Sequence, residues 1–140
     1  MELPQIVNTY IDASCRGDVE AYLATLAPDA LYSDPGTAQP LSGSAIKDHV
    51  AAIFVGFPDA TFETVASYAI TADLAVWRWV FRGTNTGSYR GLPTTGRSVN
   101  VPGCDFIEVS AGKVQRVEGY FDRLGMLQQL GLIPSMGQSG

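Results

Sequence analysis

LAVWRWVFRG, residues 74–83, decides the fold class, because its side chains alternate with a period of two. This period predicts a β-strand on which Trp77, Trp79 and Phe81 share one face, as part of the core or of a pocket wall. Three further runs show the same period: TFETVASYAI (61–70), RSVNVPGCDFIEVS (97–110) and KVQRVEGYF (113–121). Turn residues separate these runs, so we expect successive antiparallel strands.

The N-terminal part of the chain has helical periodicity instead. Ile6, Val7 and Tyr10 recur at helical spacing and predict an amphipathic helix over residues 4–16. Further helices are expected from Asp18 to before Pro28, from about Ala45 to Gly56 and over 122–131, with a frayed tail over 134–140. Helices followed by antiparallel strands predict one α+β domain, residues 1–140, with a curved antiparallel sheet wrapped around the N-terminal helices. The mouth of such a sheet is where a small-molecule pocket forms.

The composition narrows the function classes. The chain has 140 residues, 46% of them hydrophobic and 16% charged, and a net charge of −5, which argues against nucleic-acid binding. No apolar run is long enough to predict a membrane span, and the N-terminal MELPQIV does not resemble a signal peptide. We interpret Cys15 and Cys104 as reduced thiols of a cytoplasmic protein. With one histidine and no paired cysteine spacing, we expect no metal and no cofactor.

Asp34 stands where the predicted strand of ALYSDPG (30–36) runs into a turn. Pro35 ends the strand, because proline has no backbone N–H to donate to the sheet. Two interpretations remain open. An aspartate before Pro-Gly commonly accepts a hydrogen bond from its own turn, so Asp34 could be a turn residue. The other interpretation is a functional acid at the end of the strand.

Asp105 lies in the middle of a predicted strand, on a face that otherwise carries Val101, Gly103, Ile107 and Val109. A carboxylate on an apolar face must find a partner or keep its proton, because an unpaired buried charge is very costly. The alternative is that Asp105 faces water and its neighbours face the core. Tyr10 is expected to be a buried tyrosine whose hydroxyl needs an acceptor.

Other polar residues have simpler interpretations. Asp122 precedes the last predicted helix and is expected to be its N-cap. His49 is expected on the exposed flank of the third helix, beside Lys47 and Asp48. The glycine-rich stretch 83–96 lacks the Lys-Ser/Thr of a phosphate-binding loop, so it is expected to connect two strands.

The element order and the ending GYFDRLGMLQQLG (119–131), with the hairpin GLPTTGR (91–97), resemble the nuclear transport factor 2-like superfamily and its SnoaL-like polyketide cyclase branch. The resemblance spans nearly the whole chain and implies a cone-shaped fold. A second resemblance is to the ketosteroid isomerases of the same superfamily. It implies that Asp34 is the general base, and that Tyr10 and a protonated Asp105 bind the oxyanion.

The chain also departs from its relatives. Many cyclases of this branch carry a catalytic acid where this chain has Gly119, and a mid-strand histidine where it has Asp105. Trp79 and Phe81 replace the Arg and Asp of the related limonene epoxide hydrolases, which disfavours epoxide hydrolysis. The tyrosine network behind the isomerase oxyanion hole is not evident in the sequence.

These patterns predict a cofactor-free enzyme that removes a proton next to the carbonyl of a hydrophobic small molecule. The main interpretation is a ketosteroid isomerase-like isomerase, and the alternatives are an aldol-type polyketide cyclase or a non-catalytic binding or interaction module. The candidate pocket wall consists of Trp77, Trp79, Phe121 and Phe54. The resemblance also implies a homodimer that pairs through the sheet.

Overall fold

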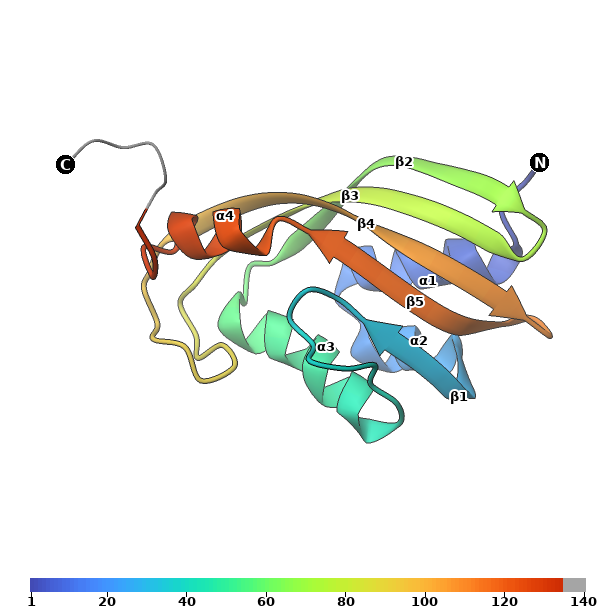
Figure 1. Ribbon diagram of the computed structural model, residues 1–140, viewed down its shortest axis with the longest axis horizontal. Coiled ribbons are helices and arrows are strands. Elements are labelled where there is room, and N and C mark those ends of the chain that lie inside the picture. The colour runs from blue at the N-terminus through green and yellow to red at the C-terminus, as the bar shows by residue number, and fades with distance from the viewer. Residues whose placement is uncertain (135–140) are drawn as a thin grey trace.

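The structure is a computed structural model that describes residues 1–134 (Figure 1). Most of the tail predicted to be frayed, residues 135–140, lies outside the described residues. The helices are α1 (Gln5–Arg16), α2 (Val19–Ala24), α3 (Ser44–Gly56) and α4 (Arg123–Gln129). The strands are β1 (Leu26–Ser33), β2 (Thr61–Thr71), β3 (Leu74–Thr84), β4 (Ser98–Ser110) and β5 (Lys113–Phe121).

The strands form one five-stranded sheet in the order β1-β5-β4-β3-β2. Strands β2 to β5 are antiparallel to their neighbours, as their turn residues predict. The exception is β1, which pairs in parallel with β5, so the expectation of an antiparallel sheet is wrong at this edge. The reason is that α3 follows β1, and a connection of that length frees β1 from pairing with the next strand along the chain.

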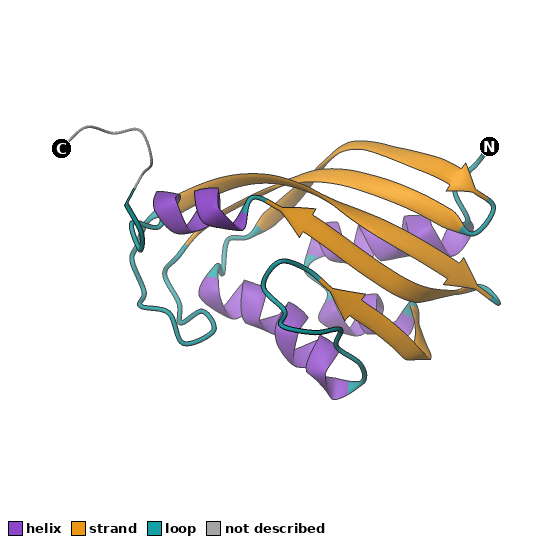
Figure 2. Cartoon of the chain, in the orientation of Figure 1, coloured by secondary structure: helices purple, strands orange, loops and turns teal. Residues whose placement is uncertain are grey.

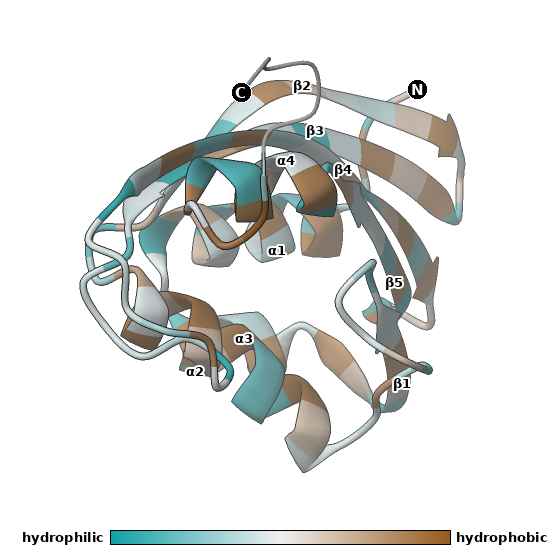
Figure 3. Ribbon diagram, turned by 60° about the vertical axis from the view of Figure 1, so that its left-hand side comes forward, coloured by the Kyte–Doolittle hydropathy of each residue, from teal (hydrophilic) through white to brown (hydrophobic). Residues whose placement is uncertain are grey.

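The sheet curves over α1, α2 and α3, which lie on its concave side (Figures 2 and 3). The predicted α+β fold with N-terminal helices inside a curved sheet is therefore confirmed. None of the helices in the described part of the chain is long and apolar enough to cross a membrane.

The ends of the short helices follow local sequence signals. Gly17, with φ 66°, ends α1 in the left-handed conformation that glycine adopts without strain. The side chain of Asp18 accepts a hydrogen bond from the backbone N–H of Ala21 and caps α2. Asp122 caps α4 in the same way, accepting from the backbone N–H of Gly125 at 2.8 Å.

The concave face of the sheet is strongly aromatic. Trp77, Trp79 and Phe81 of β3 are all buried on this face. Gly103 of β4 pairs with Trp79, and a β-carbon at Gly103 would lie 2.4 Å from the indole. Only glycine at this position lets the Trp79 ring lie across β4, toward the next inward-facing residue of that strand, Asp105.

Candidate active site

A cavity lies between the concave face of the sheet and the helices. Its wall is mainly apolar and includes all four side chains predicted for it: Phe54, Trp77, Trp79 and Phe121. The three candidate polar residues, Tyr10, Asp34 and Asp105, line the same cavity. Residues far apart in the sequence thus meet at one apolar site.

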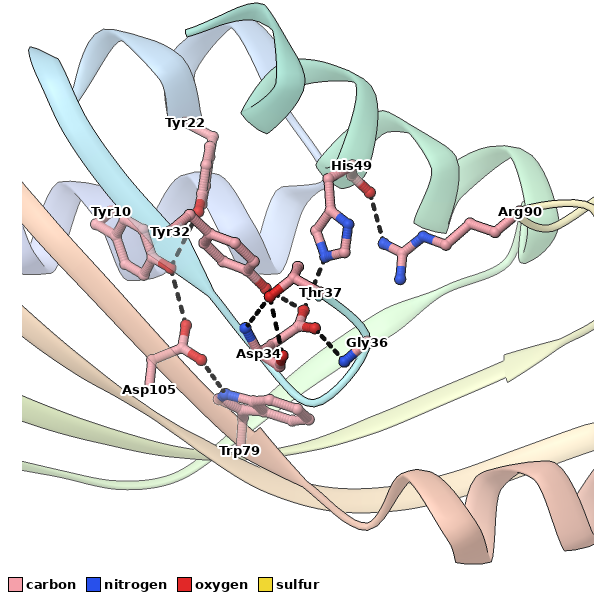
Figure 4. Close-up of polar contacts among 10 residues, drawn as sticks. All are labelled: Tyr10, Tyr22, Tyr32, Asp34, Gly36, Thr37, His49, Trp79, Arg90 and Asp105. Carbon is pink, nitrogen blue, oxygen red and sulfur yellow. Dashed lines mark hydrogen bonds and ion pairs between the residues drawn. The ribbon is translucent and has the colours of Figure 1, made fainter. Parts of the chain in front are cut away.

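Asp105 faces the cavity, and its side chain is buried. Its Oδ2 accepts a hydrogen bond from the Tyr10 hydroxyl at 2.8 Å, and its Oδ1 accepts from Trp79 Nε1 at 3.3 Å (Figure 4). Burial above all, helped by the nearby charge of Asp34, raises the pKa of Asp105 to about 6, although the hydrogen bonds from Tyr10 and Trp79 act in the opposite direction. Asp105 is therefore a carboxyl group that gains or loses its proton near neutral pH.

Gly119 of β5 provides the space that Asp105 occupies. The two residues are partners across the β4–β5 ladder. A β-carbon at Gly119 would lie 3.2 Å from Asp105 Oδ1 and 3.4 Å from the β-carbon of Asp34. The carboxyl group of Asp105 therefore lies next to position 119, where many cyclases of this branch are expected to carry a catalytic acid.

A second tyrosine stands behind the first. The hydroxyls of Tyr10 and Tyr22 are 3.2 Å apart, and both side chains are buried. Because the Tyr10 proton is directed to Asp105, Tyr22 is placed to donate its own proton to Tyr10. A second tyrosine thus backs Tyr10, although no such network is evident in the sequence. The two tyrosines come from different helices, and their pairing depends on how α1 packs against α2.

Asp34 follows the last residue of β1 and has a different set of partners. Its Oδ1 accepts a hydrogen bond from the backbone N–H of Gly36 at 2.6 Å, which is the Asx turn that Asp-Pro-Gly predicts. Its Oδ2 accepts from the Tyr32 hydroxyl at 2.7 Å and lies 2.8 Å from His49 Nε2 (Figure 4). Asp34 is thus both a turn residue and a cavity-lining acid, so the two open interpretations are compatible.

The partners of Asp34 determine its charge state. Partial burial alone would raise the pKa of Asp34, but the hydrogen bonds from His49, Tyr32 and Gly36 outweigh burial and lower it below the ordinary value. Asp34 is therefore ionised at neutral pH.

His49 is not the surface residue that its charged neighbours suggest. Its side chain is only 9% exposed, and its ring bonds to Asp34. The expectation was wrong because Lys47 and Asp48 outweighed the helical spacing: His49 lies three residues after Ile46 and four before Ile53, on the apolar side of α3. That spacing is the signal that could have identified it.

Other residues complete the description of the site. Asp122 caps α4 and does not line the cavity. Arg90, in the loop between β3 and β4, does line the cavity, and nothing in the sequence pattern pointed to it. Among residues 1–134, no group of three or more histidine, cysteine or acidic side chains is placed to hold a metal ion.

Comparisons with known proteins identify the class. The curved sheet over helices is the nuclear transport factor 2-like, or ketosteroid isomerase-like, fold. A profile of the SnoaL-like polyketide cyclase family matches residues 5–130, so the chain belongs to that family. A search of curated protein sequences gives no significant match.

Several solved structures share this fold. AclR from Streptomyces galilaeus, a proposed hydroxylase, is 19% identical with a TM-score of 0.82, over 96% of this chain and 83% of its own. IdmH from Streptomyces antibioticus, a proposed polyketide cyclase, is 28% identical with a TM-score of 0.75, over 91% of this chain and 96% of its own. A protein from Catenulispora acidiphila, solved in complex with trimethylamine, is 19% identical with a TM-score of 0.73, over 93% of this chain and 95% of its own. The family match favours the cyclase alternative over the isomerase interpretation.

Proposed function

We propose that this protein is an aldol-type polyketide cyclase that forms a carbon–carbon bond within an apolar substrate carrying several carbonyl groups. The observation that carries the proposal is the pair Asp34 and Asp105, which line one apolar cavity and have pKa values shifted in opposite directions. Two acids whose pKa values are pushed apart are suited to separate base and acid roles.

Asp34 is the proposed general base, because it is ionised and lines the cavity. Its hydrogen bonds make it a weak base, so it suits a C–H group that is already acidic. A carbon between two carbonyl groups has such a C–H, and polyketides are built from these units. The same weakness makes Asp34 less suited to an isolated ketone, which is the simpler substrate of the isomerase interpretation.

Tyr10 and protonated Asp105 are the proposed donors to the developing negative charge. Once Asp105 carries its own proton, the Tyr10 hydroxyl can turn its proton from Asp105 to the substrate oxygen, and both groups then donate. Deprotonation by Asp34 moves the C–H electron pair into an enolate, whose carbon attacks a second carbonyl of the same molecule. The new C–C bond converts that carbonyl into an alkoxide, and the proton held by Asp34 passes to it. All atoms balance, both acids return to their starting states, and the steps require no cofactor. Donors prearranged in an apolar site are effective because they need no reorganisation.

The wall formed by Phe54, Trp77, Trp79 and Phe121 would hold the apolar body of the substrate. Such a wall excludes water, and this strengthens the hydrogen bonds to the enolate. It also holds the linear substrate in the bent conformation that ring closure requires. We propose this role for the aromatic side chains as a group, because they share one continuous surface of the cavity.

The test is turnover of a synthetic linear aryl 1,3,7-triketone by purified protein, followed by the absorbance of the cyclised product. Its C2 lies between two carbonyl groups and closes a six-membered ring on the C7 carbonyl. Asp34→Asn and Asp105→Ala serve as site variants, and a β,γ-unsaturated ketone tests the isomerase reaction in parallel. The proposal requires cyclisation above the uncatalysed rate that is lost in Asp34→Asn. Binding of the triketone without turnover would instead support a non-catalytic binding module.

We also propose that two copies pair through the outer face of the sheet. Phe106 and Tyr120 lie on this face and contact each other, and they are 39% and 53% exposed. Large exposed aromatic side chains on a sheet commonly mark an interface. Sedimentation equilibrium of wild type and Tyr120→Lys measures the effect: a dimer that dissociates in the variant supports pairing through this face, and a wild-type monomer refutes it.

A further inference from the structure

Residues 89–92 form a tight turn at the mouth of the cavity. Leu92 N–H donates to the carbonyl of Tyr89 at 2.8 Å, and the two central residues, Arg90 and Gly91, have φ angles of 48° and 76°. Both central φ angles are positive, as in a type I′ turn, where asparagine or glycine is usual. Arginine is poorly suited to this backbone conformation, so its presence indicates that its side chain has a use.

The guanidinium of Arg90 is held in a defined position. Its centre lies 4.7 Å from the centre of the Tyr89 ring, and its Nη2 donates to the backbone carbonyl of His49 at 2.7 Å (Figure 4). These contacts direct the group toward the cavity that Arg90 lines. They use only part of its donor capacity, because a guanidinium carries five N–H groups.

Arg123, at the start of α4, approaches the same place from another element. A β-carbon built on Gly36 would lie 3.6 Å from Arg90 Nη1 and 3.9 Å from Arg123 Nε. Within residues 1–134, neither guanidinium has a carboxylate oxygen within 4.0 Å, although the chain carries a net charge of −5. Two unpaired positive charges therefore flank one turn at the edge of an apolar cavity.

We propose that Arg90 and Arg123 form a subsite for a carboxylate group at one end of a ligand whose apolar body fills the cavity. A guanidinium presents parallel N–H groups that match the two oxygens of a carboxylate. Asp34 on the same turn is ionised and offsets part of this positive charge, but its Oδ1 accepts from the Gly36 N–H and it forms no ion pair with either guanidinium, so both keep N–H groups for a ligand. The inference rests on the proposed function only in equating this ligand with the substrate, which would then be an anionic polyketide.

The test is calorimetric binding of a matched pair of probes, 2-naphthoate and methyl 2-naphthoate, to the full chain at pH 7 and low salt. The probes share one aromatic body and differ in the charge, so their ratio of dissociation constants reports the subsite alone. We expect naphthoate to bind about 10-fold tighter than the ester, and added salt to reduce that preference. Equal binding of the two probes, or no naphthoate binding at about 1 mM, would overturn the proposal.

Variants assign the preference to its residues. Arg90→Gln and Arg123→Gln should each weaken naphthoate binding about 5-fold and leave ester binding unchanged. Arg90→Lys, which keeps the charge, should retain part of the preference, and Arg78→Gln on the outer face of the sheet should change neither probe. An equal loss of both probes in the glutamine variants would mean a distorted cavity and would refute the subsite. Asp34→Asn should keep the preference, so a failure of the catalytic proposal remains distinguishable from a failure of this one.

Discussion

Asp34 and Asp105 are both aspartates in the wall of one cavity, yet their carboxyl groups differ in charge state. Asp34 receives three hydrogen bonds, including one from a backbone N–H and one from the only histidine of the chain. Asp105 receives two, the longer of them 3.3 Å, and it is buried. The pKa is lowered at the first residue and raised to about 6 at the second.

The difference teaches how one cavity provides two kinds of acid. Position in the fold explains it: Asp34 stands at a strand end, where turn N–H groups and the α3 side chains are within reach. Asp105 stands in the middle of β4, where the ladder uses the backbone groups and only neighbouring side chains can donate. A carboxylate in mid-strand therefore meets few donors, and its pKa rises with burial.

The largest expected effect comes from removing the ionised member of the pair. Asp34→Asn keeps the size of the side chain, but an amide cannot accept the proton, so turnover of the triketone should fall about 10²–10⁴-fold. Steady-state kinetics on folded protein, checked by circular dichroism, measures the loss. Near-wild-type turnover would show that Asp34 is only a turn residue.

The second effect separates a hydrogen-bond donor from a second base. Asp105→Ala should lose about 10²–10³-fold in turnover, because one donor to the oxyanion is removed. Asp105→Asn should keep much of the activity, because a neutral amide can also donate. Parallel kinetics of the two variants provide the comparison. If Asp105→Asn is as inactive as Asp34→Asn while folded, the residue works in its ionised form and the donor role is wrong.

A third effect concerns stability and pH. The pKa of Asp105 is about 6 in the folded chain and 3.8 in the unfolded chain, so its contribution to stability is complete below about pH 4 and is lost as the pH rises through 6. The loss of unfolding free energy is about 3 kcal/mol, because each unit of difference between the folded and unfolded pKa corresponds to about 1.4 kcal/mol. Urea unfolding of wild type and Asp105→Asn at about pH 3 and pH 7 measures this loss. From pH 3 to pH 7 the unfolding free energy of wild type should fall by about 3 kcal/mol relative to that of the variant. A constant difference across pH would contradict the raised pKa.

A fourth, smaller effect tests the histidine that sets Asp34 apart. His49→Ala removes one of the three hydrogen bonds that orient the Asp34 carboxylate, so kcat should fall about 10-fold because the base is less well positioned. The pKa that governs the acid side of the pH–rate profile should rise at the same time, because Asp34 loses a partner. His49→Gln retains a donor and should recover most of both. A change in stability alone, with an unmoved pH–rate profile, would reduce His49 to a structural role.

The smallest effect lies outside the pair. Asp122 bonds to the Gly125 N–H and caps α4, so Asp122→Ala should cost about 0.5–2 kcal/mol of unfolding free energy. Turnover per folded molecule should stay nearly constant. Thermal unfolding and kinetics of the same preparation test both parts. A fully stable variant without activity would mean that the catalytic acid has been assigned to the wrong residue.

The sequence predicted the elements better than their partners. Alternation along 74–83 and 97–110 shows which side chains share a face, so it grouped Trp79 with Trp77 and Phe81 and put Asp105 on an otherwise apolar face, which the structure buries. The parallel pairing of β1 with β5 could not be predicted, because the residues of a strand indicate which of its faces is buried but not which distant strand it pairs with. His49 and Tyr22 were missed because a polar side chain acquires its role only from what packs against it.

The parallel pairing of β1 also has a consequence for when the site forms during folding. Ser33, the residue before the proposed base, pairs with Glu118 far along the chain. Contacts between such distant segments form slowly, because the entropy of closing a long loop opposes them. The strands from β2 to β5 pair across short loops. The pairing of β1 with β5, which holds Asp34 in place, therefore joins the residues that are farthest apart in the sequence among all strand pairs of the sheet. A nascent chain therefore has no assembled pair of acids until β5 has been synthesised and has docked.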